Sequence, residues 1–249
     1  MAPAIIEVGR RGNVALLAMR AGKANAMNVR LLEALDAALE DVDDADAIVI
    51  TGEGSSFSAG LALPELILLD REHILEMIAI FEKVMRHVLA FPRATVAAIN
   101  GHAYAGGCVL ALMCDVRVMS AGKIGLNEIQ LGIGLPSIVV EPLRAKVGPH
   151  AWGPIALEGR VMEPAEALRF GLVDEVVDPE RLAARTHELA TMRATAPIPY
   201  AQIKRELLAP VLREWDRRHE SSREAWLDTW FCEHAQRTLK ATVERIAKR

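Results

Sequence analysis

Residues 95–114 read TVAAINGHAYAGGCVLALMC, a strand-like run that passes through a glycine-rich turn into an apolar helix. The segment Thr95 to Ile99 has the length and composition of a buried strand, and Gly106 to Cys114 begins a helix with small residues. The same order occurs earlier, where Ala47 to Ile50 precedes the glycine-rich loop of residues 52–60. A buried strand that is repeatedly followed by a glycine loop and a helix predicts an α/β core with parallel pairing.

The segments on either side continue this alternation. Val14 to Met19 has strand character, and Asn28 is a good N-cap for a helix that runs through the leucines after it. A second helix is expected from Ile74 to Ala90, ended by Pro92. Pro164 and Gly171 delimit a third helix by the usual preference for proline at the start and glycine at the end. Leu172 to Val177 then returns to strand character.

The composition changes after Pro197 and Pro199. From residue 200 onward, alternating arginine and glutamate residues and the absence of strand patterns predict helices with one solvated face. We therefore divide the chain into a core of residues 1–196, which holds the site, and a helical assembly region of residues 197–249. Such a region must pack on the core or on a neighbouring subunit, and we expect its large aromatic side chains partly at subunit contacts: Trp215, Trp226, Trp230 and Phe231.

Composition argues against several classes of protein. The 249 residues are 51% hydrophobic, with 29 basic and 33 acidic side chains, a formal charge of −4 and few aromatics. This balance is unfavourable for nucleic-acid binding, and no run of about 18 apolar residues predicts a membrane span. Three cysteines without a C-x-x-C pair suggest neither disulfides nor zinc. Neither the start, Met1 to Ile6, nor the last three residues resembles a targeting signal, so we expect a cytoplasmic protein.

The two glycine loops allow two interpretations. Neither has the Lys-Ser/Thr pair of a phosphate loop, and neither is a dinucleotide-binding fingerprint. They are either simple tight turns or a pair of loops whose backbone N–H groups converge on one carbonyl oxygen as an oxyanion hole. In the second interpretation, small residues matter because a side chain would block the approach of the substrate.

Glu128 is the one carboxylate in an otherwise uncharged run from Ile124 to Val140. It is either a surface glutamate on a loop or a desolvated acid whose raised pKa suits proton transfer near neutral pH. Glu65, four residues after the first loop, is the reserve acid, although a helix surface suits it better. His102 either has a structural role or lines a substrate channel. The histidine spacing predicts no metal site, and the serines lack a nucleophile elbow.

Five segments together give the chain a resemblance to the crotonase, or enoyl-CoA hydratase/isomerase, superfamily. Residues 22–27 read GKANAM, 57–61 FSAGL, 100–108 NGHAYAGGC and 125–132 GLNEIQLG, and a fifth segment runs from Glu158 to Val177. The resemblance covers the chain from about Val14 through the C-terminal helices. It implies a spiral of ββα turns followed by a helical trimerisation region, and hence a homotrimer or hexamer.

The resemblance also implies roles for individual residues. The backbone N–H groups of Leu61 and Gly106 would hold the thioester oxygen of an acyl-CoA, and Glu128 would be the catalytic acid. Coenzyme A is part of the substrate, so no separate cofactor is expected. The further substrate-binding positions are Lys23, Ala24, Ala59, Gly60, Ala62, Gly107 and Val109.

The chain departs from the family pattern at two positions, and the first of them bears on which reaction of the family is expected. Hydratases of this family carry two glutamates, but the first position is Val109 here, while Glu128 is retained. A single base suffices to move a double bond, so the resemblance is closest to the Δ3,Δ2-enoyl-CoA isomerases of fatty-acid metabolism. The second departure is Ala62, where many members have aspartate. The alternatives are a hydratase, another single-acid member such as a thioester hydrolase or decarboxylase, and a binding protein without turnover.

Overall fold

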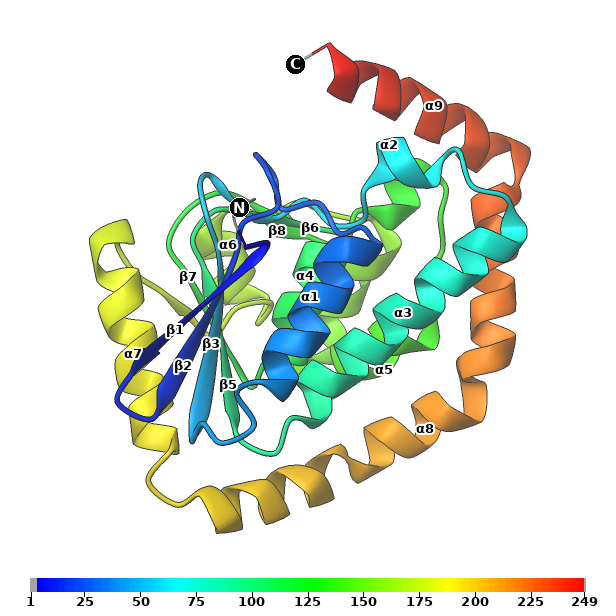
Figure 1. Ribbon diagram of the computed structural model, residues 1–249. Helices are drawn as coiled ribbons and strands as arrows, with labels where there is room; N and C mark the ends of the chain where they lie inside the picture. Colours follow the sequence, from blue (N-terminus) through cyan, green and yellow to red (C-terminus); the bar gives the residue numbers. More distant parts are fainter. Residues whose placement is uncertain (1–3, 249) are drawn as a thin grey trace.

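The computed structural model describes residues 4–248 and places two β-sheets at the centre of the molecule (Figure 1). The larger sheet has the order β1-β2-β3-β5-β7-β9, and the smaller has the order β4-β6-β8. Residues 1–3 and Arg249, on which part of the expectation about targeting signals rests, lie outside the described residues. Within residues 4–248, no helix combines the length and the apolar character needed to cross a bilayer.

Three successive ββα turns build the spiral, as the resemblance implies. In each turn the first strand joins the large sheet and the second joins the small one. The turns consist of β3 (Ala47–Gly52), β4 (Ser56–Ser58), α2 (Leu63–Leu66) and α3 (Arg71–Ala90); β5 (Ala94–Ile99), β6 (His102–Tyr104) and α4 (Gly106–Met113); and β7 (Val116–Met119), β8 (Ile124–Gly125), the 3-10 turn η1 (Glu128–Leu131) and α5 (Ser137–Lys146).

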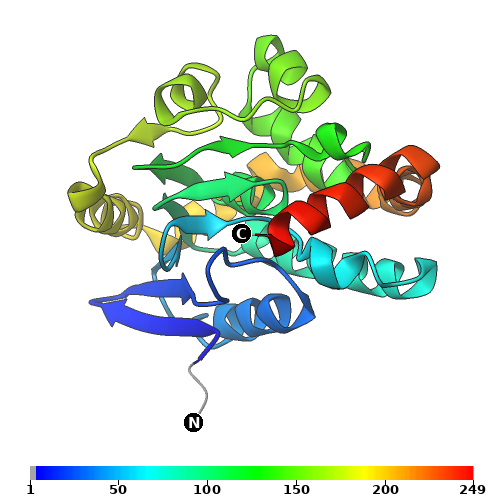
Figure 2. The same ribbon diagram turned by 90° about the horizontal axis from the view of Figure 1, so that it is seen from above.

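The first strands and the later elements complete the two sides of the large sheet. β1 (Ile6–Arg11) pairs antiparallel with β2 (Val14–Met19), and all other strand pairs are parallel. One apolar core lies between this sheet and the helices α1 (Val29–Glu40), α3, α4 and α5. A second, smaller core lies between the opposite face and α7 (Leu182–Arg193). Figure 2 shows the strands side by side from above, with helices on both faces, as a parallel sheet requires.

The sequence-based elements agree with the structure except near residue 172. Here α6 (Pro164–Arg169) is followed by a strand of two residues, β9 (Glu175–Val176), instead of one from Leu172 to Val177. The N–H groups of Leu172 and Val173 donate to Ala167 O at 2.9 and 3.4 Å. Because these two residues complete the end of the helix, they are not free to pair with β7.

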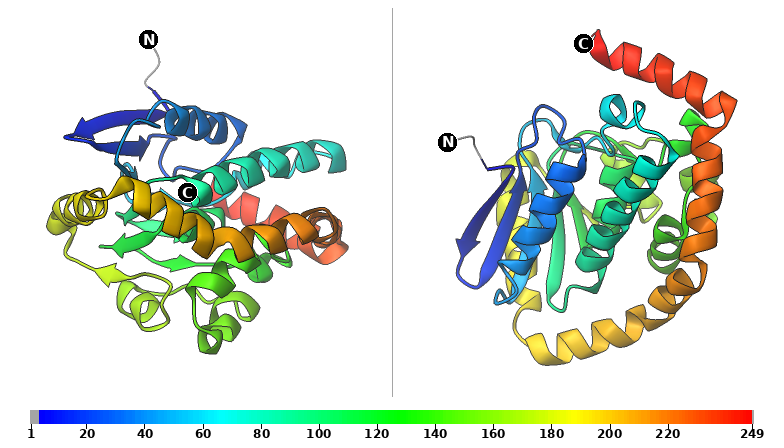
Figure 3. Two further views of the ribbon diagram at one scale, coloured as in Figure 1. Left: turned by 90° about the horizontal axis from the view of Figure 1, so that it is seen from below. Right: turned by 45° about the vertical axis from the view of Figure 1, so that its right-hand side comes forward.

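The remaining chain forms two helices that wrap around the core. α8 (Pro197–Phe231) passes beneath the sheet and bends up the side, and α9 (Glu233–Ala247) lies across the top (Figure 3). Ion pairs fasten α8 to α5 and α3, including Arg218 to Glu141 at 2.8 Å and Arg86 to Asp216 at 2.7 Å. The expectation that the aromatics of this region lie at subunit contacts is wrong for its tryptophans. Trp215, Trp226 and Trp230 are at most 5% exposed and pack against the core of their own chain.

Asn25 fixes the loop that leads into α1 against the first glycine loop. It is fully buried and has a positive φ of 47°. Its side chain accepts from Ala21 N at 2.9 Å and donates to Glu53 O at 3.2 Å and Ser56 O at 2.9 Å. Asparagine suits this position because it tolerates the left-handed region and offers both a donor and an acceptor.

Replacing Asn25 with alanine leaves three backbone groups without their partner, one of them buried and two at the ends of part-buried bonds. We expect Asn25→Ala to lower the free energy of unfolding by about 2–4 kcal/mol, measured by urea denaturation. The matched control is Asn13→Ala, which removes one exposed hydrogen bond to Asp46 and should cost about 0.5 kcal/mol or less. Equal losses in the two variants would show that Asn25 has no special structural role.

Candidate active site

Two backbone segments run side by side at the start of the site. The N–H of Ala59 donates to Ala24 O at 2.8 Å, that of Met27 to Gly60 O at 2.7 Å, and that of Ala62 to Met27 O at 2.9 Å. These bonds join residues 24–27 to residues 59–62. The structure therefore brings together the predicted substrate-binding positions Ala24, Ala59 and Ala62, with the exposed Lys23 beside them.

The second glycine loop is seated directly on the first, and two glycines permit this contact. Gly60 has a positive φ of 83°, and a Cβ on it would lie 2.7 Å from Tyr104 O and 2.9 Å from Gly106 N. A Cβ on Gly107 would lie 2.2 Å from Ser58 O. Real side chains do not approach backbone this closely, so both positions require glycine. The two loops are thus one structural unit. Simple tight turns, the first of the two interpretations, do not account for this contact.

The predicted oxyanion donors meet at this junction. A Cβ on Gly106 would lie 3.5 Å from Leu61 N, so the two loops present their N–H groups at one place. Within residues 4–248, neither Leu61 N nor Gly106 N donates to an acceptor. Gly106 also begins α4, whose dipole is positive at this end. Two unpaired N–H groups and a helix dipole can stabilise negative charge that develops on a carbonyl oxygen.

Ala105 holds the second loop in a strained conformation next to Gly106. Its φ is 47°, in the left-handed region that a residue with a Cβ seldom adopts. Two bonds fix it, from Ala105 N to Gly125 O at 2.9 Å and from Val109 N to Ala105 O at 2.9 Å. From this conformation the chain enters α4 at Gly106, whose N–H donates to no acceptor in the described residues.

Glu128 lies three residues beyond Gly125, at the start of η1. Its residue as a whole is half-buried, but Oε2 is buried and has no hydrogen-bond partner. This burial raises the pKa of Glu128 to about 7, although its own backbone N–H offsets part of the effect. The charge of Glu128 in turn contributes to raising the pKa of the buried Cys108 thiol on α4. Because Gly125 pairs with Tyr104, Glu128 and the first turn of α4 follow neighbouring strands of the small sheet.

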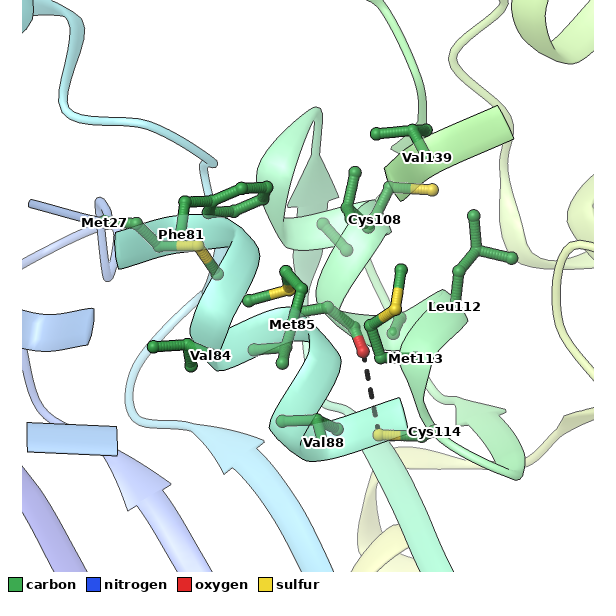
Figure 4. Close-up of a cluster of buried hydrophobic side chains, with 14 of the residues drawn as sticks. Met27, Phe81, Val84, Met85, Val88, Cys108, Leu112, Met113, Cys114 and Val139 are labelled. Carbon is green, nitrogen blue, oxygen red and sulfur yellow. Dashed lines mark hydrogen bonds between the residues drawn. The ribbon is translucent and has the colours of Figure 1, made fainter. Parts of the chain in front are cut away.

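Buried apolar side chains of α3 and α4 lie around the loop junction. Val109 is 1% exposed on α4, and Phe81 of α3 borders the loop junction, with Cε2 3.4 Å from a Cβ placed on Gly106. Figure 4 shows Phe81 and Cys108 in the packed cluster between α3 and α4. In the described part of the chain, no charged side chain is close enough to contribute to the pKa of Glu128. The site holds one acid of raised pKa beside an oxyanion hole.

The C-terminal helix of the same chain covers these elements. α9 contacts both η1, which carries Glu128, and α2, which follows Leu61. The contact is close at Gly132, where a Cβ would lie 2.6 Å from His234 Cδ2 and 3.2 Å from Ala235 Cα. The helical region predicted for assembly thus also packs against the site of its own chain.

Two other predicted residues lie outside the junction. Glu65 is exposed on α2, and its two carboxylate oxygens accept from Asn28 Nδ2 at 3.0 and 3.1 Å. Nδ1 of His102 accepts from Tyr104 Oη at 2.7 Å and from Lys123 N at 3.2 Å. Both arrangements fit structural roles. In residues 4–248, no three histidine, cysteine or carboxylate side chains lie together in a way that could hold a metal ion.

The roles of three buried or half-buried polar residues near the site were missed by reasoning from the sequence. Ser58 is buried and joins the two segments, because its Oγ donates to Asn25 O at 2.7 Å and accepts from Gly60 N at 3.2 Å. Asn25 supports the same loop, and Asn127, next to Glu128, has a buried Oδ1 without a partner. Polar residues among glycines and alanines were the available signal, but their partners are distant in the sequence.

Known proteins share both the sequence and the fold. The enoyl-CoA hydratase/isomerase family matches residues 9–248. A protein of Rhizobium meliloti (strain 1021) described as "Probable enoyl-CoA hydratase" is 37% identical over 205 residues, which cover 80% of this chain and 79% of that protein. The mouse mitochondrial enoyl-CoA delta isomerase 1 is 31% identical over 212 residues, covering 82% of this chain and 73% of that protein.

Among solved structures, the human mitochondrial delta3-delta2-enoyl-CoA isomerase superposes with a TM-score of 0.92 at 25% identity and covers 98% of both chains. The names of these relatives include both hydratases and isomerases, so they agree on the class of substrate and differ on the reaction. With its ββα spiral and its match over nearly the whole length, the chain belongs to the enoyl-CoA hydratase/isomerase family of crotonase-fold acyl-CoA enzymes.

Proposed function

We propose that the protein is a Δ3,Δ2-enoyl-CoA isomerase, which moves a double bond from C3 to C2 of an acyl thioester. The observation that carries this proposal is the single buried carboxyl of Glu128, with a pKa of about 7, beside the unpaired N–H groups of Leu61 and Gly106. A second acid is missing from its surroundings in the described residues, and Val109 occupies the position where hydratases of the family carry one.

The reaction begins at the thioester carbonyl. Its oxygen accepts hydrogen bonds from Leu61 N–H and Gly106 N–H, which stabilise the negative charge that forms when C2 loses a proton. The carboxylate of Glu128 takes that proton, and the electron pair of the C–H bond moves onto the thioester oxygen as a dienolate. The carboxylic acid then returns the proton to C4, the double bond between C2 and C3 forms, and the base is regenerated.

One carboxyl can serve both carbons. C2 and C4 are about 2.5 Å apart by ordinary bond lengths and angles, so a small displacement of the carboxyl reaches either carbon within contact distance. An acid with a pKa near neutral suits this shuttle, because it can both accept and release a proton at physiological pH. Hydration requires a second catalytic group, since two groups must orient a water molecule and accept and donate its protons.

Substrate binding follows from the two joined segments. We assign Lys23, Ala24, Ala59 and Ala62 to the coenzyme A portion of the substrate, and Gly60, Gly107 and Val109 to the wall around the thioester. Among the N–H groups of residues 59–62, that of Leu61 donates to no acceptor in the described residues and is the one available to the substrate. Coenzyme A arrives with the substrate, so the reaction uses no separate cofactor.

Hydration of 2-enoyl-CoA is the second candidate, and the hydratase names among the relatives favour it. The two reactions separate in one pair of assays. An isomerase converts 3-enoyl-CoA into the conjugated 2-enoyl-CoA, which increases ultraviolet absorbance. A hydratase consumes 2-enoyl-CoA, which decreases the same absorbance.

Removing the base should abolish isomerisation without unfolding the protein. We expect Glu128→Gln to lower kcat for 3-enoyl-CoA by about 10²–10⁴-fold, with acyl-CoA binding retained, as measured by the conjugation assay and by calorimetric titration. The matched control is Glu65→Gln, which neutralises an exposed glutamate and should retain wild-type turnover. If Glu65→Gln were the inactive variant instead, Glu65 would be the base and the assignment of Glu128 would be wrong.

The raised pKa of Glu128 predicts opposite pH dependences of activity and stability. Because the base must be ionised, kcat/KM should rise with pH and level off above about pH 7. The ordinary pKa of 4.5 applies to the unfolded chain, so the folded state binds this proton more tightly. The stabilising contribution is therefore complete below about pH 4.5 and is lost as the pH rises to about 7.

Glu128→Gln lacks this titration, so its melting temperature relative to the wild type should increase between pH 5 and pH 8. A constant difference across that range, or a flat kcat/KM profile, would contradict a desolvated carboxyl.

The identity of residue 109 should decide between isomerisation and hydration. We expect the wild type not to add water to 2-enoyl-CoA, and Val109→Glu to add water slowly while losing isomerase activity. Two nearby carboxyls can hold a water between them, and mutual repulsion leaves one acid and one base at neutral pH. The buried charge should also cost several kcal/mol of stability. Val109→Gln is the uncharged control, and fast hydration by the wild type would overturn the isomerase proposal.

A further inference from the structure

The turn that carries Glu128 is closed by the loop of residues 132–134, which is fastened to a distant part of the chain. The N–H of Ile133 donates to Glu128 O at 3.1 Å and completes η1. The next N–H along the chain, that of Gly134, donates to Oγ1 of Thr229 on α8 at 2.9 Å. Two successive residues therefore connect the turn of Glu128 to a side chain that lies 95 positions after Gly134.

The hydroxyl of Thr229 is itself held in place. Thr229 lies in the last turn of α8, just before the chain turns into α9. Its Oγ1 donates to Trp226 O at 2.7 Å, so the hydroxyl proton is used and the oxygen accepts from Gly134 N. Trp226 is 5% exposed, and its ring centroid lies 5.3 Å from that of the buried Trp230. A buried stretch of helix thus fixes the position of the hydroxyl.

The corner between α8 and α9, residues 229–235, is seated on the loop of residues 132–134. A Cβ on Gly134 would lie 3.5 Å from Thr229 Oγ1, and a Cβ on Gly132 would lie 3.2 Å from Ala235 Cα. Figure 1 shows this corner, where α8 rises along the side of the core and α9 returns across the top. The loop after Glu128 therefore contacts the point at which the C-terminal helices change direction.

The opposite side of η1 is held by a second bond. Nε2 of Gln130 donates to Gly159 O at 2.7 Å. A Cβ on Gly159 would lie 3.4 Å from Asn127 Cα, so the two segments are in contact. A 3-10 turn of four residues has poor internal hydrogen-bond geometry, and these outside bonds give it the support that it lacks.

The support matters because Oε2 of Glu128 is buried and has no hydrogen-bond partner. An ionised carboxyl is stabilised when water reaches it, so a turn that is free to move would rotate Oε2 toward solvent. The bonds on both sides of η1 oppose this rotation. The bond from Gly134 N is the nearer of the two to the backbone of Glu128, since the adjacent Ile133 N donates to Glu128 O.

We propose that Thr229 is a positioning residue for Glu128, because its hydroxyl fixes the end of η1 and keeps Oε2 away from water. The assignment rests on the proposed function, in which Glu128 is the base. Thr229 acts through Gly134 and through the adjacent bond from Ile133 N to Glu128 O. Without the hydroxyl, the N–H of Gly134 turns to water, the adjacent bond loosens, and water reaches the carboxyl.

The pKa of Glu128 reports on this support, because burial is what raises it. Other titratable side chains lie on the segments around η1, and in the described residues none of them contributes to that pKa: Cys108 of α4, Glu233 and His234 of α9, and Glu158 and Arg160 on either side of Gly159. A change in the pKa of Glu128 therefore measures the entry of water and not a change in a neighbouring charge.

Thr229→Val keeps the shape of the side chain and removes the hydroxyl. We expect kcat for 3-enoyl-CoA to fall by about 10-fold or more, with KM little changed, because the base is misplaced while the binding segments stay intact. The pKa of Glu128 should fall from about 7 toward its ordinary value of 4.5. The pH profile of kcat/KM measures this shift, as does an infrared titration of the carboxyl band read against the same protein carrying Glu128→Gln.

Two variants serve as matched controls. Thr229→Ser retains the hydroxyl and should keep both the pKa of Glu128 and a near-wild-type kcat. Ser222→Ala removes a similar bond from the same helix, since Ser222 Oγ accepts from the N–H of Ser137 at the start of α5 at 2.7 Å. Ser222→Ala and Thr229→Val should both lower the melting temperature by about 2–4 °C, but only Thr229→Val should change the pKa of Glu128 and kcat.

A wild-type kcat and an unchanged pKa of Glu128 in Thr229→Val would overturn the proposal. Equal losses in Thr229→Ser or in Ser222→Ala would overturn it too, because they would assign the effect to side-chain shape or to a general loss of stability.

Failure of the proposed function is a separate result. A wild type that does not isomerise 3-enoyl-CoA would refute the isomerase proposal, whereas the infrared titration needs no substrate. In that case a lower pKa of Glu128 in Thr229→Val would still support the positioning role of Thr229, and an unchanged pKa would refute it.

Discussion

The close approach of two backbone loops is the constraint on which the rest of this structure depends. Gly60 and Gly107 have no room for a Cβ, because the backbone of the other loop occupies that space. The contact places Leu61 N and Gly106 N together, and the buried Ser58 and Asn25 hold it from behind through side-chain hydrogen bonds. Since each loop continues from a strand of the rigid parallel sheet, the large core serves to hold two N–H groups in a fixed relation.

Desolvation gives the site its second property. An oxyanion hole strengthens as water is excluded, and the same exclusion raises the pKa of Glu128 to about 7. Both effects depend on the exclusion of water, which the buried side chains of Val109, Cys108 and Phe81 on α3 and α4 favour. A buried carboxylate oxygen without a hydrogen-bond partner, such as Oε2 of Glu128, costs stability, and such a cost is typical of groups kept for chemistry. The neighbouring Ala105, with its positive φ, adds backbone strain at the same place.

The C-terminal helices link this site to the rest of the chain. α8 spans the underside and side of the core, fastened by buried tryptophans and by ion pairs such as Arg218 with Glu141. α9 then returns over the top to contact η1 and α2. The helical region, for which packing on the core or on a neighbouring subunit is predicted, packs on the core of its own chain. At the end of α8, the hydroxyl of Thr229 accepts from Gly134 N in the loop that follows Glu128.

The sequence by itself determined the alternation of strands and helices, the two glycine loops, the lone acid at Glu128 and the family, because these depend on local pattern and spacing. Predictions from the sequence were wrong where a residue could pair with either of two partners. Leu172 and Val173 complete a helix instead of a strand, and the tryptophans of α8 pack on the core of their own chain instead of on a neighbouring subunit. Only the tertiary structure decided that Asn25 and Ser58 support the loops, that Oε2 of Glu128 is buried, and that Thr229 contacts the loop after Glu128. Hydrogen bonding and desolvation arise between residues far apart in the chain, and no local pattern records them.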